Sequence, residues 1–164
     1  VEGMPEPWRS AGLVVLLTGL RWGELAALTA DDIDLRRGVV HVHRSRSRDG
    51  SIGPPKTEHG VRSVTLDSTS RDIFAARAAE RPDGLLWPGS YRQAADTLRA
   101  ALREHGLYRR GRGWHTLRSA HERLIEEHGL AVRDAGARMG HGANLTQTLA
   151  YGWASEHAPV DGLG

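Results

Sequence analysis

Six residues of the chain have side chains whose types suit chemistry on a phosphodiester. They are two arginines, two histidines, one lysine and one tyrosine: Arg21, Lys56, His115, Arg118, His141 and Tyr151. A tyrosine hydroxyl is a weak nucleophile at its ordinary pKa of about 10, so it needs cations and a base nearby. Arginines can bind the non-bridging oxygens of a phosphate, and histidines can donate hydrogen bonds or move protons. The set predicts strand transfer at a phosphate ester, in a scheme that requires no metal and no cofactor.

Lys56 is the single lysine among 22 lysine and arginine residues. An arginine-rich composition is typical of a GC-rich genome, but it makes a lone lysine conspicuous. Lysine can give up a proton, whereas arginine cannot at any ordinary pH. The leaving 5′-oxygen of a phosphodiester needs a proton, which a lysine in a cationic site could supply.

Five motifs resemble those of the tyrosine recombinases, or phage-type integrases. TGLRWGEL, PPKTEHGVRSVTL, HTLR, RMGH and TLAYG follow one another in the family's order, from about residue 12 to residue 152. The resemblance implies that Arg21 and Arg118 clamp the scissile phosphate and that His141 supports it. Glu24 matches the acidic residue that orients the basic groups of the site.

The same resemblance assigns the proton transfers and the nucleophile. Lys56 corresponds to the lysine that acts as general acid toward the leaving 5′-hydroxyl, and His115 to the histidine that assists proton transfer at the nucleophile. Tyr151 would form a 3′-phosphotyrosyl bond, which the 5′-hydroxyl of another strand could then attack. The implied activity is site-specific recombination or integration of DNA without ATP.

The expected partner is double-stranded DNA, bound through phosphate contacts. Two arginine-rich segments are candidates for these contacts: Arg44, Arg46, Arg48, Arg109, Arg110 and Arg112. The resemblance further implies a homotetramer on DNA, a monomer or weak self-association when free, and accessory proteins that bend the DNA. No membrane partner is expected. The expected location is the cytoplasm of a prokaryote, at the nucleoid, in a phage-derived or similar element.

The helices and strands that the sequence pattern predicts around these residues form an α+β domain that is mostly helical. Helices are expected over 11–18, with Ser10 as the cap and Gly19 as the stop, and over 22–29, 70–80, 90–106, 116–129, 131–140 and 145–154. Strands over 39–45 and 61–66, joined by a polar loop, form a small antiparallel sheet. In helix 90–106 the inner stripe is expected to contain Ala94, Leu98, Ala101, Leu102 and His105; in helix 116–129 it is expected to contain Leu117, Ala120, Leu124 and His128.

A length of 164 residues, with 39% hydrophobic and 26% charged residues, fits one globular domain rather than a disordered chain. The absence of cysteine excludes disulfides and thiolate metal sites. His121 and His128 lack the usual zinc spacing and are predicted to pack or to face solvent. Residues 1–164 are expected to form a single catalytic domain, the C-terminal fragment of a longer recombinase that lacks the N-terminal core-binding domain of the family.

Two other functions stay open as alternatives. One is DNA relaxation of the type IB topoisomerase kind, which shares the catalytic set. The other is a DNA-binding relic that keeps the fold and has lost activity, against which the presence of all six chemical positions argues. A hydrolase that uses Ser119 with His115 is rejected, because neither an acidic orienter nor a nucleophile elbow accompanies them.

Overall fold

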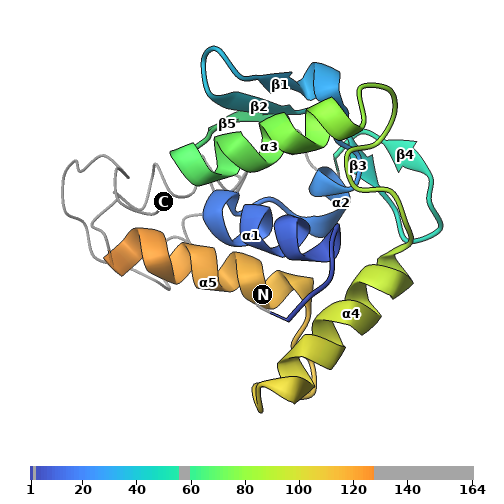
Figure 1. The fold of residues 1–164 in the computed structure, drawn as a ribbon, viewed down its shortest axis with the longest axis vertical. Coiled ribbons are helices and arrows are strands. Elements are labelled where there is room, and N and C mark those ends of the chain that lie inside the picture. Colours follow the sequence, from blue (N-terminus) through green and yellow to red (C-terminus); the bar gives the residue numbers. More distant parts are fainter. Residues whose placement is uncertain (2, 56–59, 128–164) are drawn as a thin grey trace.

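The computed structural model describes residues 1, 3–55 and 60–127 of the chain. At its centre lies α1 (Trp8–Thr18), in which Ala11, Val14 and Val15 are fully buried. Figure 1 shows α1 between α3 (Ser68–Glu80) and α5 (Trp114–Glu127), and the same helix also contacts α4 (Tyr91–Glu104). A helix that is apolar on nearly every side must be enclosed by others. The fold is therefore built around α1.

The end of α1 confirms one prediction and its start corrects another. Gly19 adopts the left-handed conformation, with a φ of 69°, and its N–H donates to the carbonyl of Val15. Ser10 was expected to cap the helix, but the helix begins at Trp8. The Ser10 hydroxyl instead donates to the carbonyl of Pro7 at 2.9 Å. A serine can bond the backbone within the first turn as well as cap it, so its type alone misplaced the start.

The chain after Gly19 forms shorter elements than expected. The helix predicted over 22–29 is a single turn, α2 (Trp22–Leu25), although Leu25 and Leu28 are both buried as predicted. A 3₁₀ turn, η1 (Ala30–Asp32), follows. The Asp32 carboxylate closes this turn by accepting from the backbone N–H of Thr29 at 2.7 Å.

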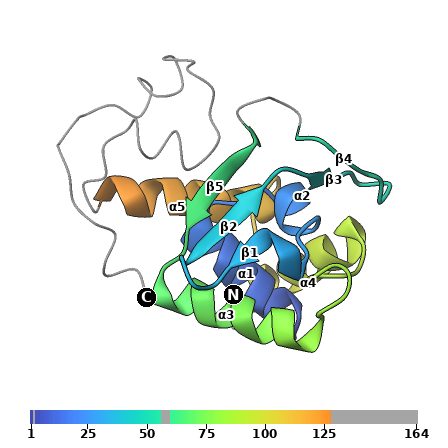
Figure 2. The ribbon, with the colours of Figure 1, turned by 90° about the horizontal axis from the view of Figure 1, so that it is seen from above.

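The predicted antiparallel sheet is present, with one additional strand. The strands β1 (Ile33–Asp34), β2 (Val39–Val42) and β5 (Arg62–Thr65) lie side by side in the order β1-β2-β5 (Figure 2). The register pairs His41 with Ser63 and Val42 with Arg62. Val40, Val42 and Val64 are buried, so this alternating face of the sheet joins the core.

The strand predicted over 39–45 ends at Val42, and a separate two-stranded hairpin begins at Ser45 and extends into the segment expected to be a loop. It consists of β3 (Ser45–Arg46) and β4 (Ile52–Gly53), which contact α2 through β3. The turn closes with a hydrogen bond from the Ser47 N–H to the Ser51 carbonyl at 2.8 Å. Strands of two residues leave almost no periodic pattern, which is why the sequence indicated only turns.

The two helices after the sheet begin at side-chain caps. Asp67 accepts from the backbone N–H of Ser70 and caps α3; Ser90 forms a capping box with Gln93 at the start of α4. Most of the predicted α4 stripe faces the core, but His105 is exposed, so its place on that stripe was wrong. The helix ends at Glu104, one residue before it.

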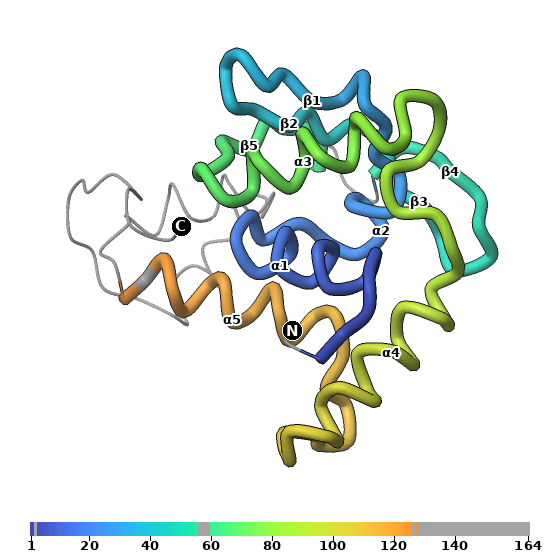
Figure 3. The backbone as a smooth tube through the Cα atoms, viewed as in Figure 1, coloured from blue at the N-terminus to red at the C-terminus, as the bar shows by residue number. Residues whose placement is uncertain are grey.

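Helix α5 presents a different face to the core from the one predicted. Leu117, Ala120 and Leu124 were expected inside and are only half-buried. The buried stripe consists of Trp114, Arg118, His121 and Ile125. Figure 3 shows α5 running beside α1, and the two helices are in contact. The His121 Nδ1 on the buried stripe lies 2.9 Å from the Leu16 carbonyl oxygen. His121 is thus a packing residue. No helix among the described residues is long and apolar enough to cross a membrane.

Candidate functional site

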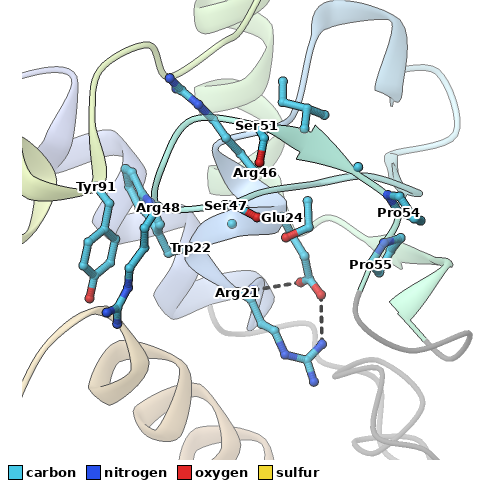
Figure 4. Close-up of a pocket in the computed structure, with 14 residues that line it drawn as sticks. Arg21, Trp22, Glu24, Arg46, Ser47, Arg48, Ser51, Pro54, Pro55 and Tyr91 are labelled. Atoms are coloured by element: carbon cyan, nitrogen blue, oxygen red, sulfur yellow. Dashed lines mark hydrogen bonds and ion pairs between the residues drawn. The ribbon is translucent and has the colours of Figure 1, made fainter.

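Arg21 is held at the start of α2 by its own helix. Its backbone is extended, and Glu24, one turn later, accepts both the Arg21 backbone N–H at 2.8 Å and the Arg21 Nη1 at 2.9 Å. Figure 4 shows the guanidinium directed toward the Glu24 carboxylate from outside α2. The Arg21 side chain is 44% exposed, whereas that of Glu24 is 2% exposed. A buried carboxylate therefore orients a cation that remains accessible to a ligand.

A second arginine binds the same carboxylate from the sheet. Arg62, on β5, donates through Nη1 to Glu24 Oε1 at 3.0 Å and through Nη2 to Glu24 Oε2 at 2.9 Å. Arg62 was not predicted from the sequence to belong to the site. One signal could have revealed it, because alternation along β5 places Arg62 on the same face as the buried Val64. A charged residue on the inner face of a strand needs a buried partner.

Burial and the two arginines bound to Glu24 shift its pKa in opposite directions. Burial is the largest single influence and favours the neutral acid, but the hydrogen bonds and positive charge of Arg62, with the hydrogen bonds of Arg21, outweigh it. The pKa of Glu24 is therefore lowered from its ordinary value of 4.5. Glu24 is a carboxylate at neutral pH.

We expect Glu24→Gln to lower the free energy of unfolding by about 3 kcal/mol at pH 7, because it leaves Arg62 buried without a counter-charge. A carboxylate with a lowered pKa stabilises the fold above its unfolded pKa, and this stabilisation is lost as the pH falls through the lower, folded value. Denaturant unfolding at pH 7 and at about pH 3 should thus show the two proteins converging in acid. An equal difference at both pH values would contradict the ion-pair account.

Arg118 is the third arginine of the cluster and lies on the buried stripe of α5. It is 2% exposed, and its Nη1 donates to the Gly19 carbonyl at 2.5 Å. Burial, then the positive charge of Arg21, lower its pKa to about 10; Arg62 adds to this effect, and Glu24 and Glu122 oppose it. The guanidinium is still charged at pH 7. Arg21 and Arg62 thus bind Glu24, and Arg118 lies close enough to feel the charges of all three. The positive charge of the three arginines exceeds the negative charge of Glu24 and Glu122, and this excess is suited to an anion.

His115 lies on the first turn of α5, three residues before Arg118, and is exposed. The turn is fixed by the Thr116 hydroxyl, which accepts from the Gly113 N–H at 3.2 Å. The preceding Trp114 packs on Trp22, with ring centroids 4.6 Å apart. Because Trp22 follows Arg21, this aromatic contact joins the two elements that carry Arg21 and His115. The structure thereby brings three predicted site residues together, Arg21, Glu24 and Arg118. It places His115 next in the chain to a tryptophan that packs on Trp22.

A pocket of about 810 Å³ opens between α2 and the β3–β4 hairpin, next to Arg21 (Figure 4). Its wall includes the aromatic residues Trp22 and Tyr91 and the hairpin arginines Arg46 and Arg48. The Arg48 guanidinium lies over the Tyr91 ring, 4.8 Å from its centroid. Cationic and aromatic groups thus line a concave surface beside the arginine cluster.

The six arginines expected to contact DNA have different surroundings. Arg44 pairs with Asp32 at 2.7 Å, and Arg46 donates to the Gly89 carbonyl at 2.9 Å, so both also stabilise the local fold. Arg48 is exposed and lines the pocket. The remaining three are exposed in the loop between α4 and α5: Arg109, Arg110 and Arg112.

Three of the predicted catalytic residues lie outside the described residues: Lys56, His141 and Tyr151. The helices expected over 131–140 and 145–154, and His128, also lie there. Pro55 and Gly60 flank the segment that contains Lys56. A side chain at Gly60 would lie 2.3 Å from the Pro55 Cβ, so these two residues are in close contact.

Comparison with known proteins gives one family. Residues 4–156 match the model of the phage integrase family. Over 146 residues, which are 84% of this chain and 46% of the relative, the chain is 30% identical to the tyrosine recombinase XerD of Pseudomonas putida. A stretch of 49 residues, 30% of this chain and 12% of the relative, is 53% identical to the prophage integrase IntR of Escherichia coli. Both matches span less than half of the relative's length.

Solved structures show the same fold. A complex of the Tn1549 transposon integrase with transposon right end DNA has a TM-score of 0.77 at 21% identity, over 98% of this chain and 58% of that one. The XerA recombinase has a TM-score of 0.63 at 19% identity, over 92% of this chain and 61% of that one. The α+β architecture, mostly helical with a small antiparallel sheet, is thereby confirmed.

Proposed function

Because the chain belongs to the phage integrase family, we propose that it is the catalytic domain of a site-specific recombinase that cleaves and rejoins DNA strands. The observation that carries this proposal is the cluster of Arg21, Arg62 and Arg118 around Glu24. The positive charge of these three arginines exceeds the negative charge of Glu24. The cluster therefore carries an excess of positive charge beside an accessible pocket. A phosphodiester is an anion that such a cluster would bind, and its transition state carries still more negative charge.

In the proposed reaction Arg21 and Arg118 bind the non-bridging oxygens of the scissile phosphate, and His141 supports them. The hydroxyl oxygen of Tyr151 attacks phosphorus and gives up its proton with the assistance of His115. The bond between phosphorus and the 5′-oxygen breaks, and Lys56 protonates that oxygen. The 3′-phosphotyrosyl bond keeps the energy of the phosphodiester, so a second 5′-hydroxyl can attack it and rejoin the strands.

The DNA contacts follow from the position of the pocket. The strand next to the scissile phosphate would run along the β3–β4 hairpin, where Arg48 is exposed, and the arginines of the 107–113 loop would contact a neighbouring phosphate. Arg44 and Arg46 would contribute mainly by keeping the hairpin in place, since both are bonded within the protein. Contacts of this kind position the duplex and do not read its sequence.

The assembly around this domain is also a proposal. Residues 1–164 would act as one domain of a longer recombinase whose N-terminal domain grips the DNA. Four copies would assemble on two duplexes, with DNA-bending proteins as accessory factors. The protein would act on DNA in the cytoplasm of a prokaryote, as part of a phage-derived or similar element. Its tyrosine recombinase and integrase relatives support this location.

The activity can be tested with nicked suicide duplexes taken from the DNA that flanks the gene. The protein, in its longest natural form, is incubated with labelled duplex without added metal, and covalent products are separated on a denaturing gel. We expect a protein–DNA adduct, because loss of the short nicked fragment removes the hydroxyl that would reverse cleavage. Binding to the duplex without any adduct would instead support a DNA-binding relic of this fold.

A further inference from the structure

We propose that Arg62 is a positioning residue, which holds Glu24 so that Glu24 can aim the Arg21 guanidinium at the bound phosphate. This inference rests on the proposed function and extends it to a residue that touches no substrate. It is carried by the geometry of three side chains: Arg21 just before α2, Glu24 on α2 and Arg62 on β5.

Glu24 and Arg21 alone would hold one another weakly. Glu24 belongs to a helix of only four residues, and Arg21 is the residue before that helix. An ion pair three residues apart with a half-exposed arginine is easily broken by solvent. Arg21 would then sample several rotamers. A second contact is needed to keep the carboxylate in one orientation.

Arg62 supplies that contact from a more rigid element. Its two terminal nitrogens bind the two Glu24 oxygens side by side, at 3.0 and 2.9 Å, which fixes the plane of the carboxylate. Its own place is set by the pairing of β5 with β2 and by a hydrogen bond from Nη1 to the Gly60 carbonyl at 3.1 Å. The carboxylate also accepts two bonds from Arg21, so its four acceptor positions are filled in one arrangement.

The charge of Arg62 has a separate consequence. A lone carboxylate beside Arg21 would cancel the charge that Arg21 needs for a phosphate. Arg62 neutralises Glu24 in its place, at a side chain that is itself 7% exposed and turned inward. Glu24 can therefore orient Arg21 without cancelling its positive charge, and the charges of Arg21 and Arg118 remain available to the ligand.

The orientation can be measured without DNA, by ¹⁵N relaxation of arginine Nε–Hε groups in the 164-residue chain. The Arg21 signal is assigned from its loss in Arg21→Lys. We expect an ordered Arg21 guanidinium in the native protein, and an order parameter that falls below about 0.6 in Arg62→Gln. Arg77→Gln is the matched control, since Arg77 is also an inward arginine, bonded to the Leu86 carbonyl at 3.1 Å, but lies away from Glu24. An Arg21 order parameter unchanged in Arg62→Gln would overturn the proposal.

The consequence for cleavage is measured as the single-turnover rate of adduct formation at saturating DNA. Arg62→Gln should slow it roughly 10- to 100-fold, as expected for a displaced clamp, with little change in DNA affinity. In an Arg21→Ala background the same change should have less than about a twofold effect, because Arg62 acts through Arg21. Equal effects in both backgrounds would assign Arg62 a merely structural role.

Arg62→Lys covers the case in which Arg62→Gln does not fold. It keeps the charge and loses the paired donors, so it should restore folding while Arg21 stays less ordered than in the native protein. An Arg21 guanidinium as ordered in this variant as in the native protein would contradict the proposal. If the native protein forms no adduct, the proposed function fails, and the relaxation measurement still decides the role of Arg62.

Discussion

Replacing Tyr151 with phenylalanine is expected to abolish the covalent protein–DNA adduct, a loss of at least about 10³-fold in the rate of its formation. The change removes one oxygen atom, which is the atom that must bond to phosphorus in the proposed reaction. DNA affinity should hardly change, because the phosphate would still be bound by Arg21 and Arg118. The measurement is the denaturing-gel assay with suicide duplexes, combined with a binding titration on the same DNA.

Tyr108→Phe is the matched control for this experiment. Tyr108 lies in the loop after α4, where its ring packs under the Arg103 guanidinium, and that contact needs no hydroxyl. The control should form adduct at the native rate. If Tyr151→Phe still formed the adduct, another residue would be the nucleophile and the assignment from the TLAYG motif would be wrong.

Replacing Arg118 with lysine is expected to slow cleavage about 10²- to 10³-fold, the usual cost of removing one group that stabilises a charged transition state. Arg118 is buried and forked, with one nitrogen already committed to the Gly19 carbonyl. A lysine keeps the charge but carries all of its donors on one nitrogen, so it cannot bind the backbone and a phosphate oxygen in the geometry of the guanidinium fork. The single-turnover rate of adduct formation measures the effect.

Arg123→Lys tests whether the loss is specific to the buried position. Arg123 lies on the same helix, α5, and is exposed, so its replacement should alter neither the cleavage rate nor the melting temperature. A rate for Arg118→Lys within a factor of about two of the native rate would show that this guanidinium is not part of the phosphate clamp.

Several features of the fold and the site follow from local patterns in the chain. Gly19 ends α1 in the left-handed conformation as predicted, because the glycine follows the last apolar residues of the helix directly. The alternation of Val40 and Val42 predicted the inner face of the sheet correctly. The motifs also predicted that Arg21, Glu24 and Arg118 belong together. These features depend on local spacing or on residue types in a fixed order, both of which are visible in the chain.

The tertiary structure alone decided which cations are buried and what binds them. A hydrophobic pattern assigns arginine to the surface. The inner face of α5 was therefore predicted to contain Leu117 and Leu124, and Arg62 was not predicted to be buried. In the folded protein Arg118 reaches a carbonyl 99 residues away and Arg62 a carboxylate 38 residues away. Burying a charge is favourable only when such partners are in place. Those partners are brought together by packing, which no local spacing encodes.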